Sequence, residues 1–409
     1  MTTIIKKLND NTFKIQIKGL TKIFVLKKCV CVFIILLKFN LIAHSIITVK
    51  NTLKVCIAHK LSTCTIHNIS NVIYIFDKFN NKIQSSNQYI NVSYIDKNNI
   101  DIDGYILTLP VVIQPSSDGC IFVFNKAYRG HLLLQQSYLN SNCFDIINII
   151  CLEDYLKGVL PQEIYKHWSF EALKVQAIIS RTYVIKNYNR HMNQGFDICA
   201  TTHCQVYGGL SNEAEVCNQA IVETECQVLT YKGLLAQTVF HASCGGHTEN
   251  PKYIWDSTNV PRYLKGVKCH YCSKSPYFSW TGKLEEKFIR NQLINNNFCN
   301  IGKIRQINIK GKTRHGTVKQ LEIIHSQGKL NIHAYKFRLA ISTWNIKSNM
   351  FKSIKKCRGK FCFNGKGWGH RVGLCQWGTK VMAEKGKTYK QILSYFYPKT
   401  KIDKIQYQN

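Results

Sequence analysis

The sequence predicts a mixed α+β protein with a β-rich core around one buried helix, preceded by a small β-rich region. Two observations carry this prediction. From residue 46 to residue 150, short apolar runs alternate with Asn, Asp and Gly, which is typical of several strands joined by turns. Residues 169–188 then contain neither Gly nor Pro and have apolar side chains all round the axis, which indicates a helix buried on most sides.

The remaining elements follow in chain order. Helices are expected at 211–225, 284–296, 376–385 and 389–397, a β-hairpin turning at Lys232 and Gly233 at 226–243, and strands at 304–346. The expected domains are a leader at 1–45, a β-rich region at 46–150 and one larger domain at 151–401. A β-rich subdomain at 279–355 is expected within that larger domain.

Length and charge narrow the class of protein. The 409 residues, 45% of them hydrophobic, suffice for about two or three domains. A net charge of +32 ordinarily indicates nucleic acid, an anionic membrane or an acidic polymer as partner. The excess is nearly all lysine in a chain rich in Ile and Asn, as AT-rich coding produces. Because the charges are dispersed and do not alternate with aromatics on one element, no nucleic-acid partner is expected.

The first 45 residues resemble a targeting segment. Lysines precede an apolar run at 29–37, Lys38 interrupts the run, and Ala43 and Ser45 are spaced like a cleavage site. Three interpretations are open: a secretory signal peptide, an uncleaved anchor in the inner membrane, and a buried core strand. Either of the first two predicts an exported protein in the periplasm or elsewhere outside the cytoplasm.

Three motifs in sequence carry the functional information. They are LEDYLKGVLPQEI at 152–164, HASCGGHTEN at 241–250 and GKGWGHRVGLCQWG at 365–378. In this order and spacing, residues 152–401 closely resemble the SpoIID/LytB family of peptidoglycan lytic transglycosylases. The resemblance implies cleavage of the MurNAc-GlcNAc β-1,4 bond, leaving 1,6-anhydroMurNAc ends, in wall remodelling, division or sporulation. It also implies peptidoglycan glycan strands, denuded by a partner amidase, as the substrate.

Glu163 suits the role of catalytic acid. Glycosidic cleavage needs a carboxylic acid that is still protonated near neutrality. Leu160, Pro161 and Ile164 give Glu163 an apolar setting, which disfavours the carboxylate. The alternative is a solvent-facing Glu at the start of a helix, but the resemblance implies the catalytic acid. One carboxyl group is enough for a transglycosylase, because the sugar's own 6-hydroxyl attacks the anomeric carbon.

Further residues are expected to contact the substrate. Arg181 lies in an apolar helix, so it must meet a carboxylate or line a cleft. The resemblance implies that it lines the active site, and a structural salt bridge is the alternative. The other expected contacts are Ser243, Gly245, Gly246, Trp368, His370 and Gln376. Glycine-rich segments with Trp are also common at tight packing corners, and this alternative stays open.

Four residues are expected to bind a structural zinc ion. His191, Cys199, His203 and Cys204 can close a tetrahedral shell with no open position, and the resemblance implies that they are ligands. The alternative is a disulfide between Cys199 and Cys204. No organic cofactor is expected. Cys269 and Cys272, with Cys244, form either a second thiolate cluster or a disulfide, and the close pair Cys357 and Cys362 is unassigned.

Two residues depart from the family pattern. Arg371 replaces the usual Gly after the His of the third motif, and Cys375 replaces a common Ser. Position 371 is expected to need a permissive backbone, so substrate fit there is in doubt. Two rival functions remain: a non-catalytic peptidoglycan-binding scaffold and a zinc-dependent nucleic-acid-binding protein. Retention of Glu163 argues against the scaffold.

Overall fold

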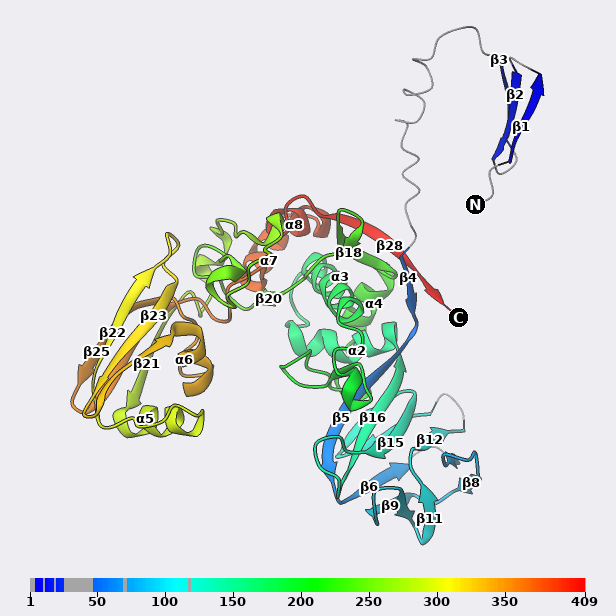
Figure 1. Cartoon of the computed structure of the whole chain (residues 1–409), viewed down its shortest axis with the longest axis horizontal. Helices are drawn as coiled ribbons and strands as arrows, with labels where there is room; N and C mark the ends of the chain where they lie inside the picture. Colours follow the sequence, from blue (N-terminus) through cyan, green and yellow to red (C-terminus); the bar gives the residue numbers. More distant parts are fainter. Residues whose placement is uncertain are drawn as a thin grey trace. The chain divides into compact units, whose positions relative to one another are not determined.

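The computed structural model describes residues 4–9, 12–17, 20–25, 47–68, 72–116 and 119–408 (Figure 1). It has two units, Met1–Ile46 and Ile47–Asn409. In the first unit, β1 (Ile4–Asn9), β2 (Thr12–Ile17) and β3 (Leu20–Val25) form an antiparallel sheet. The apolar run at 29–37 and the cleavage-like residues Ala43 and Ser45 lie outside the described residues. Within the described part, no helix is long and apolar enough to cross a membrane.

Two sheets begin the second unit. A seven-stranded sheet has the order β17-β5-β16-β15-β12-β7-β8, and a six-stranded sheet has the order β11-β10-β9-β6-β13-β14. The bounds of their strands are β5 (Thr52–Leu61), β6 (Thr63–Asn68), β7 (Ile73–Phe76), β8 (Lys82–Ser85), β9 (Tyr89–Tyr94), β10 (Asn99–Ile102), β11 (Tyr105–Thr108), β12 (Val111–Pro115), β13 (Ile121–Val123), β14 (Lys126–Tyr128), β15 (His131–Gln136), β16 (Phe144–Cys151) and β17 (Ile198–Cys199). Side chains alternate between the core and solvent, as in β9, where Ile90 and Val92 are buried between exposed neighbours.

Three helices follow, which are α2 (Leu152–Glu163), α3 (Phe170–Lys186) and α4 (Glu215–Glu223). Helix α2 packs against β5 and β16, and the other two pack against α2. Helix α3 is buried along nearly its whole length. It contacts α2, α4, α7 (Gln376–Glu384), α8 (Tyr389–Phe396) and β18 (Gln227–Tyr231). The prediction of a buried helix at 169–188 is therefore confirmed, and α3 is the central element of the larger core (Figure 1).

A four-stranded sheet of order β19-β18-β28-β4 joins segments from both ends of the second unit. Its strands are β4 (Ile47–Lys50), β18 (Gln227–Tyr231), β19 (Leu234–Leu235) and β28 (Lys401–Gln408). The predicted hairpin turns at Lys232 and Gly233, which both have positive φ. The hairpin is shorter than the predicted 226–243, because β20 (Phe240–His241) pairs in parallel with β27 (Leu374–Cys375) instead. Helices α7 (Gln376–Glu384) and α8 (Tyr389–Phe396) follow close to their expected positions.

Residues between β20 and β27 build a second hydrophobic core, whose members run from Trp280 to Phe363. Its elements are β21 (Ser279–Glu285), α5 (Glu286–Asn295), β22 (Ile304–Lys312), β23 (Val318–His325), β24 (Gly328–His333), α6 (Ala334–Ile341), β25 (Phe351–Cys357) and β26 (Lys360–Lys366). The strands form two three-stranded sheets. The expectation of strands throughout 304–346 was wrong at α6, which packs against α5. The predicted α+β class is confirmed.

Candidate active site

Glu163 is the last residue of α2 and is half-buried. Burial raises the pKa of Glu163 from 4.5 to about 7, although the Val206 amide donates to Oε1 at 3.0 Å and opposes the shift. The negative end of the α2 dipole also disfavours a carboxylate there. The site therefore holds a carboxyl group that remains substantially protonated near neutral pH.

Gln376 holds the backbone of Glu163 in place. Its Nε2 donates to the carbonyl oxygen of Glu163 at 2.7 Å and to Oε1 of Gln176 at 3.3 Å. Gln376 begins α7 and Gln176 lies on α3, so this amide joins α2, α3 and α7 at the acid. Gln376 was expected to contact substrate, and in the structure its amide orients Glu163.

The loop that carries Val206 is packed tightly against α2. Gly208 donates its amide to the Gly158 carbonyl at 3.0 Å, and the Tyr155 hydroxyl donates to Oε1 of Gln205 at 3.2 Å. A Cβ at Gly158 would lie 2.5 Å from the Tyr207 ring, so only glycine permits this approach. These contacts fix the Val206 amide beneath Glu163.

The four expected zinc ligands converge at the start of the same loop. The donor atoms of His191, Cys199, His203 and Cys204 all lie within 4.8 Å of one another. Sγ of Cys204 is 3.4 Å from Nε2 of His191 and 3.6 Å from Nδ1 of His203. Zinc bonds of about 2.0 to 2.3 Å place neighbouring tetrahedral ligands roughly 3.5 Å apart, so the donor set fits a closed zinc site. Both cysteines are free thiols in this arrangement.

Arg181 lies away from the surface. Its side chain is completely buried, and Nε and Nη2 donate to the two carboxylate oxygens of Glu153 at 2.8 and 2.7 Å. The carbonyl oxygens of Gln227 and Ile221 accept two further hydrogen bonds from its guanidinium, each at 3.2 Å. The Tyr407 hydroxyl donates to the same Glu153 carboxylate. These contacts match the structural salt bridge, the alternative to a residue that lines the cleft.

The second and third motifs cross as two backbone segments. Ser243 and Trp368 exchange amide-to-carbonyl hydrogen bonds of 3.1 and 2.7 Å. A Cβ at Gly245 would lie 2.9 Å from the Gly367 nitrogen, and a Cβ at Gly367 would lie 2.7 Å from the Ser243 oxygen. Ser243 and Gly245 are buried, and Gly246 is half-buried. The glycines thus permit the crossing itself, as the packing-corner alternative describes.

A band of aromatic side chains begins two residues after Glu163. Tyr165 packs against Trp168 at 5.4 Å, and Trp168 against Trp377 at 5.4 Å. Burial is the main cause that raises the pKa of Tyr277, and a hydrogen bond with the neighbouring Tyr165 hydroxyl is the second. The Tyr277 ring lies 4.3 Å from Trp368, which lies 5.1 Å from Trp344. Tyr165 is 51% exposed and Trp344 is 72% exposed, so the band reaches the surface at both places.

His370 packs beside this band without joining it. Its ring lies 5.0 Å from Trp255 and 5.6 Å from His241. Burial, together with the nearby Arg338 guanidinium, lowers the pKa of His370 to about 3. His370 is therefore neutral at physiological pH, and its Nδ1 accepts a hydrogen bond from the Val372 amide at 3.1 Å.

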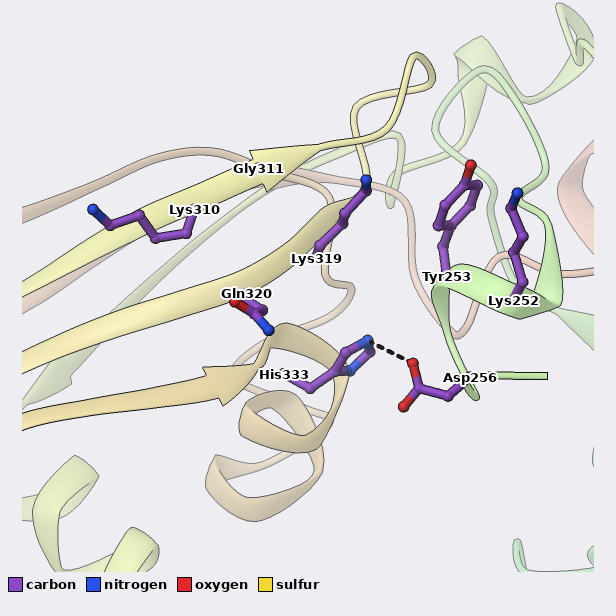
Figure 2. Close-up of a pocket in the computed structure, with 8 residues that line it drawn as sticks. All are labelled: Lys252, Tyr253, Asp256, Lys310, Gly311, Lys319, Gln320 and His333. Carbon is purple, nitrogen blue, oxygen red and sulfur yellow. Dashed lines mark ion pairs between the residues drawn. The ribbon is translucent and has the colours of Figure 1, made fainter. Parts of the chain in front are cut away.

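A hollow of about 500 Å³ lies elsewhere, between the segment that follows the second motif and the sheet β22-β23-β24 (Figure 2). Lys252, Lys310 and Lys319 line it, and His333 forms an ion pair with Asp256 at 3.9 Å. None of the expected site residues lines this hollow, so we do not assign it to the reaction centre.

Comparisons with known proteins identify the family. Residues 140–231 match the family described as "Stage II sporulation protein" (SpoIID), and residues 247–373 match a domain of unknown function, DUF8618. An uncharacterized protein of Brachyspira hyodysenteriae is 35% identical over 253 residues, which cover 62% of this chain and 66% of that protein. The chain belongs to the SpoIID family.

Two Bacillus subtilis relatives have descriptive names. The "Amidase enhancer" is 30% identical over 60% of this chain, and the match spans only 40% of that relative. "Stage II sporulation protein D" is 27% identical over 62% of this chain and 74% of that relative. These relatives support a role related to the cell wall.

Several residues around Glu163 were missed by sequence reasoning. The Val206 contact is a backbone amide, which carries no sequence signal. Gln176 was hidden in a helix that was described only as apolar. Tyr165, by contrast, lies two residues from the predicted acid, and its aromatic side chain could have been noted.

Proposed function

We propose that this protein is a lytic transglycosylase that cleaves the MurNAc-GlcNAc bond of denuded peptidoglycan strands. The single observation that carries the proposal is Glu163, a carboxyl group whose pKa of about 7 suits a general acid. The membership of the chain in the SpoIID family supports a substrate in the cell wall.

Glu163 performs both proton transfers in this mechanism. Oε1 of Glu163 accepts the hydrogen bond from the Val206 amide, so we assign the catalytic proton to the other carboxyl oxygen, Oε2. That proton passes to the glycosidic oxygen as its bond to the anomeric carbon breaks. The 6-hydroxyl of the same MurNAc then attacks the anomeric carbon, and Glu163 takes up the hydroxyl proton. The acid is regenerated and no water is consumed.

The surroundings favour one carboxyl group acting alone. The other acidic residues of α2 and α3 are each paired with a cation: Glu153 with Arg181, Asp154 with Lys157, and Glu171 with Lys174. A hydrolase with two carboxyl groups needs a second one within about 10 Å that is free to activate water or attack the sugar. These pairs remove the neighbouring candidates on both helices.

The aromatic band supplies a surface for sugar rings. Tyr165, Tyr277, Trp368 and Trp344 offer flat apolar faces that lead away from the acid. Nζ of Lys347 lies 4.3 Å from the centroid of the Trp368 ring, and burial lowers the pKa of this lysine. Its ammonium group is suited to the lactyl carboxylate of muramic acid beside a ring stacked on Trp368.

A zinc ion on His191, Cys199, His203 and Cys204 would serve as a structural ion in this scheme. When bound, it cross-links the loop and supplies no open coordination position. The chain's own Val206 then presents its amide to Glu163. The proposal further includes export to the periplasm or another extracytoplasmic space, with the N-terminal segment as signal or anchor, and an amidase that removes stem peptides first.

Digestion of denuded glycan strands by the full chain tests the proposal. We expect products with 1,6-anhydro ends, which are one water lighter than the reducing ends a hydrolase leaves, and no products from Glu163→Gln. Strand binding without anhydro products by a folded parent protein would overturn the enzyme in favour of a scaffold. Products with ordinary reducing ends would overturn the transglycosylase in favour of a hydrolase.

A further inference from the structure

Four buried thiols meet below the crossing of the second and third motifs. Cys244, Cys269, Cys272 and Cys375 are each at most 1% exposed, and their sulfur atoms all lie within 4.8 Å of one another. Cys244 follows β20, Cys272 lies in the 3-10 helix η5 (Tyr271–Lys274), and Cys375 ends β27. We propose that these four cysteines bind one structural zinc ion as a tetrathiolate site. This inference does not depend on the proposed reaction.

The sulfur spacing fits a shared ion. Sγ of Cys244 lies 3.4 Å from Sγ of Cys272, far beyond the bond of about 2.05 Å in a disulfide. With Zn–S bonds of about 2.3 Å, two sulfur ligands on one tetrahedral zinc lie roughly 3.7 Å apart. In an iron-sulfur cluster the four thiolates are distributed over two or four iron atoms, which spreads the whole set of sulfurs more widely. A single tetrahedral ion is therefore the occupant that the spacing favours.

Backbone groups around the sulfurs suit thiolates. The Cys244 amide points at Sγ of Cys375 at 3.3 Å, and the Gly378 amide approaches the same sulfur at 3.4 Å. A Cβ at Gly378 would lie 2.9 Å from Sγ of Cys269, so a side chain there would displace a ligand. Both amides stabilise negative charge on sulfur, because they offer donors where water is excluded.

A buried cation compensates the charge of such a site. Zinc with four thiolates carries a net charge of −2, and Arg371 lies beside it, completely buried. Nε of Arg371 donates to the Cys244 carbonyl at 2.8 Å, and Nη2 donates to the His247 carbonyl at 3.0 Å. The backbone of Arg371 has a φ of +66°, so this position does need a permissive conformation. The two departures from the family pattern, Arg371 and Cys375, thus serve one site.

The ion would cross-link three segments, one of which holds the backbone of Glu163. Cys375 directly precedes Gln376, whose amide holds the Glu163 carbonyl. Cys244 lies between Ser243 and Gly245, where the second motif crosses the third. Because thiols lose their protons when they bind zinc, the site forms with release of protons and stabilises the folded chain.

Metal analysis of the full chain, purified under reducing conditions with zinc, tests this site. We expect two zinc ions per chain in the parent protein, one in Cys272→Ser, one in Cys204→Ser and none in the double variant. Cys217→Ser is the matched control, because Cys217 is a fully buried free thiol outside both groups, and it should retain two zinc ions. Cobalt bound to Cys204→Ser should show the intense sulfur-to-metal charge transfer of four thiolates.

The parent protein decides the outcome even if a variant misfolds. Thiol titration of the denatured, chelated parent should recover all four cysteines of the group as free thiols. One zinc ion per chain with four thiols missing would overturn the proposal in favour of disulfides. Iron in place of the second zinc would overturn the zinc assignment. One zinc ion that Cys272→Ser retains and Cys204→Ser loses, with all thiols free, would show that the group binds no metal.

Discussion

The backbone amide of Val206 donates to Oε1 of Glu163 across 3.0 Å, joining the loop that carries Cys199, His203 and Cys204 to the proposed catalytic acid. Val206 follows the ligand Cys204 by two residues. A change in that group therefore reaches the acid through one short piece of backbone. If the proposed zinc binds and Glu163 is the acid, this link makes the metal relevant to the proposed reaction without any contact to substrate.

The first prediction concerns that link. Cys204→Ser should lose one zinc ion and lower kcat by roughly 100-fold with little change in KM, because a misplaced Val206 amide shifts Glu163 away from its productive geometry. His203→Cys, which keeps four donors, should retain the zinc ion and most of the activity. Metal content and glycan-strand kinetics check both variants. An unchanged kcat in a zinc-free Cys204→Ser protein would contradict the link.

A second prediction follows from the pKa of Glu163. The acid must be protonated, so kcat/KM should be highest below pH 7 and fall about tenfold per pH unit above it. A pH profile of strand cleavage from pH 5 to pH 9 checks this. A fall in kcat/KM that begins near pH 4.5 would mean that burial does not raise the pKa of Glu163.

The same group should make the fold less stable at high pH. Between pH 4.5 and pH 7 the native protein keeps a proton that the unfolded chain releases, so the free energy of unfolding falls as pH rises. The difference between 4.5 and about 7 corresponds to about 3 kcal/mol. Glu163→Gln should therefore be more stable than the parent by up to this amount at pH 8 and nearly equal to it at pH 4. Urea unfolding at both pH values measures the difference.

A third prediction separates stability from binding at Arg181. Arg181→Ala should destabilise the fold by about 3 to 5 kcal/mol, because Glu153 loses its bidentate partner in a buried setting. The KM of the folded Arg181→Ala protein for glycan strands should equal that of the parent. Arg262→Ala, at an exposed arginine, should alter stability by less than about 0.5 kcal/mol. A raised KM with unchanged stability in Arg181→Ala would instead support substrate binding by Arg181.

A fourth prediction tests the aromatic band. Trp344→Ala should raise KM for long strands roughly threefold to tenfold, because one exposed stacking face of about 1 kcal/mol is lost. Its stability should hardly change, since the Trp344 side chain is 72% exposed. Leu339→Ala removes a comparably exposed apolar side chain outside the band and is the matched control. Equal KM values in both variants would exclude the band as the strand-binding surface.

The sequence allowed part of this arrangement to be predicted. The buried helix was visible because residues 169–188 lack Gly and Pro. Helix α2 was not, because Gly158 and Pro161 look like helix breakers. Gly158 is there because the Tyr207 ring leaves no space for a Cβ, a tertiary contact that no local pattern encodes. Helix α6 was hidden for a related reason, since its packing against α5 decides its conformation.

Some features of the candidate site could likewise be predicted from the sequence, and others could not. The resemblance identified Glu163 as the expected acid, and its apolar neighbours agreed with a raised pKa. The spacing of His191, Cys199, His203 and Cys204, together with the resemblance, predicted that their donor atoms would meet. The role of Arg181 could not be decided, because its partner Glu153 lies 28 residues away on another helix. Cys375 was seen only as a departure, because its three companion thiols reach it through folding and not through sequence spacing.

The sheet β19-β18-β28-β4 determines when the larger core can be completed during synthesis. Strand β28, at residues 401–408, is an interior strand that joins β18 on one side and β4, at residues 47–50, on the other. The ribosome makes β4 early, yet β4 acquires its partner strand only after residues 401–408 have emerged. The hydroxyl of Tyr407 on this strand also donates to Glu153, which is the ion-pair partner of Arg181 on α3. A nascent chain therefore cannot finish the core around α3 until residues 401–408 have emerged.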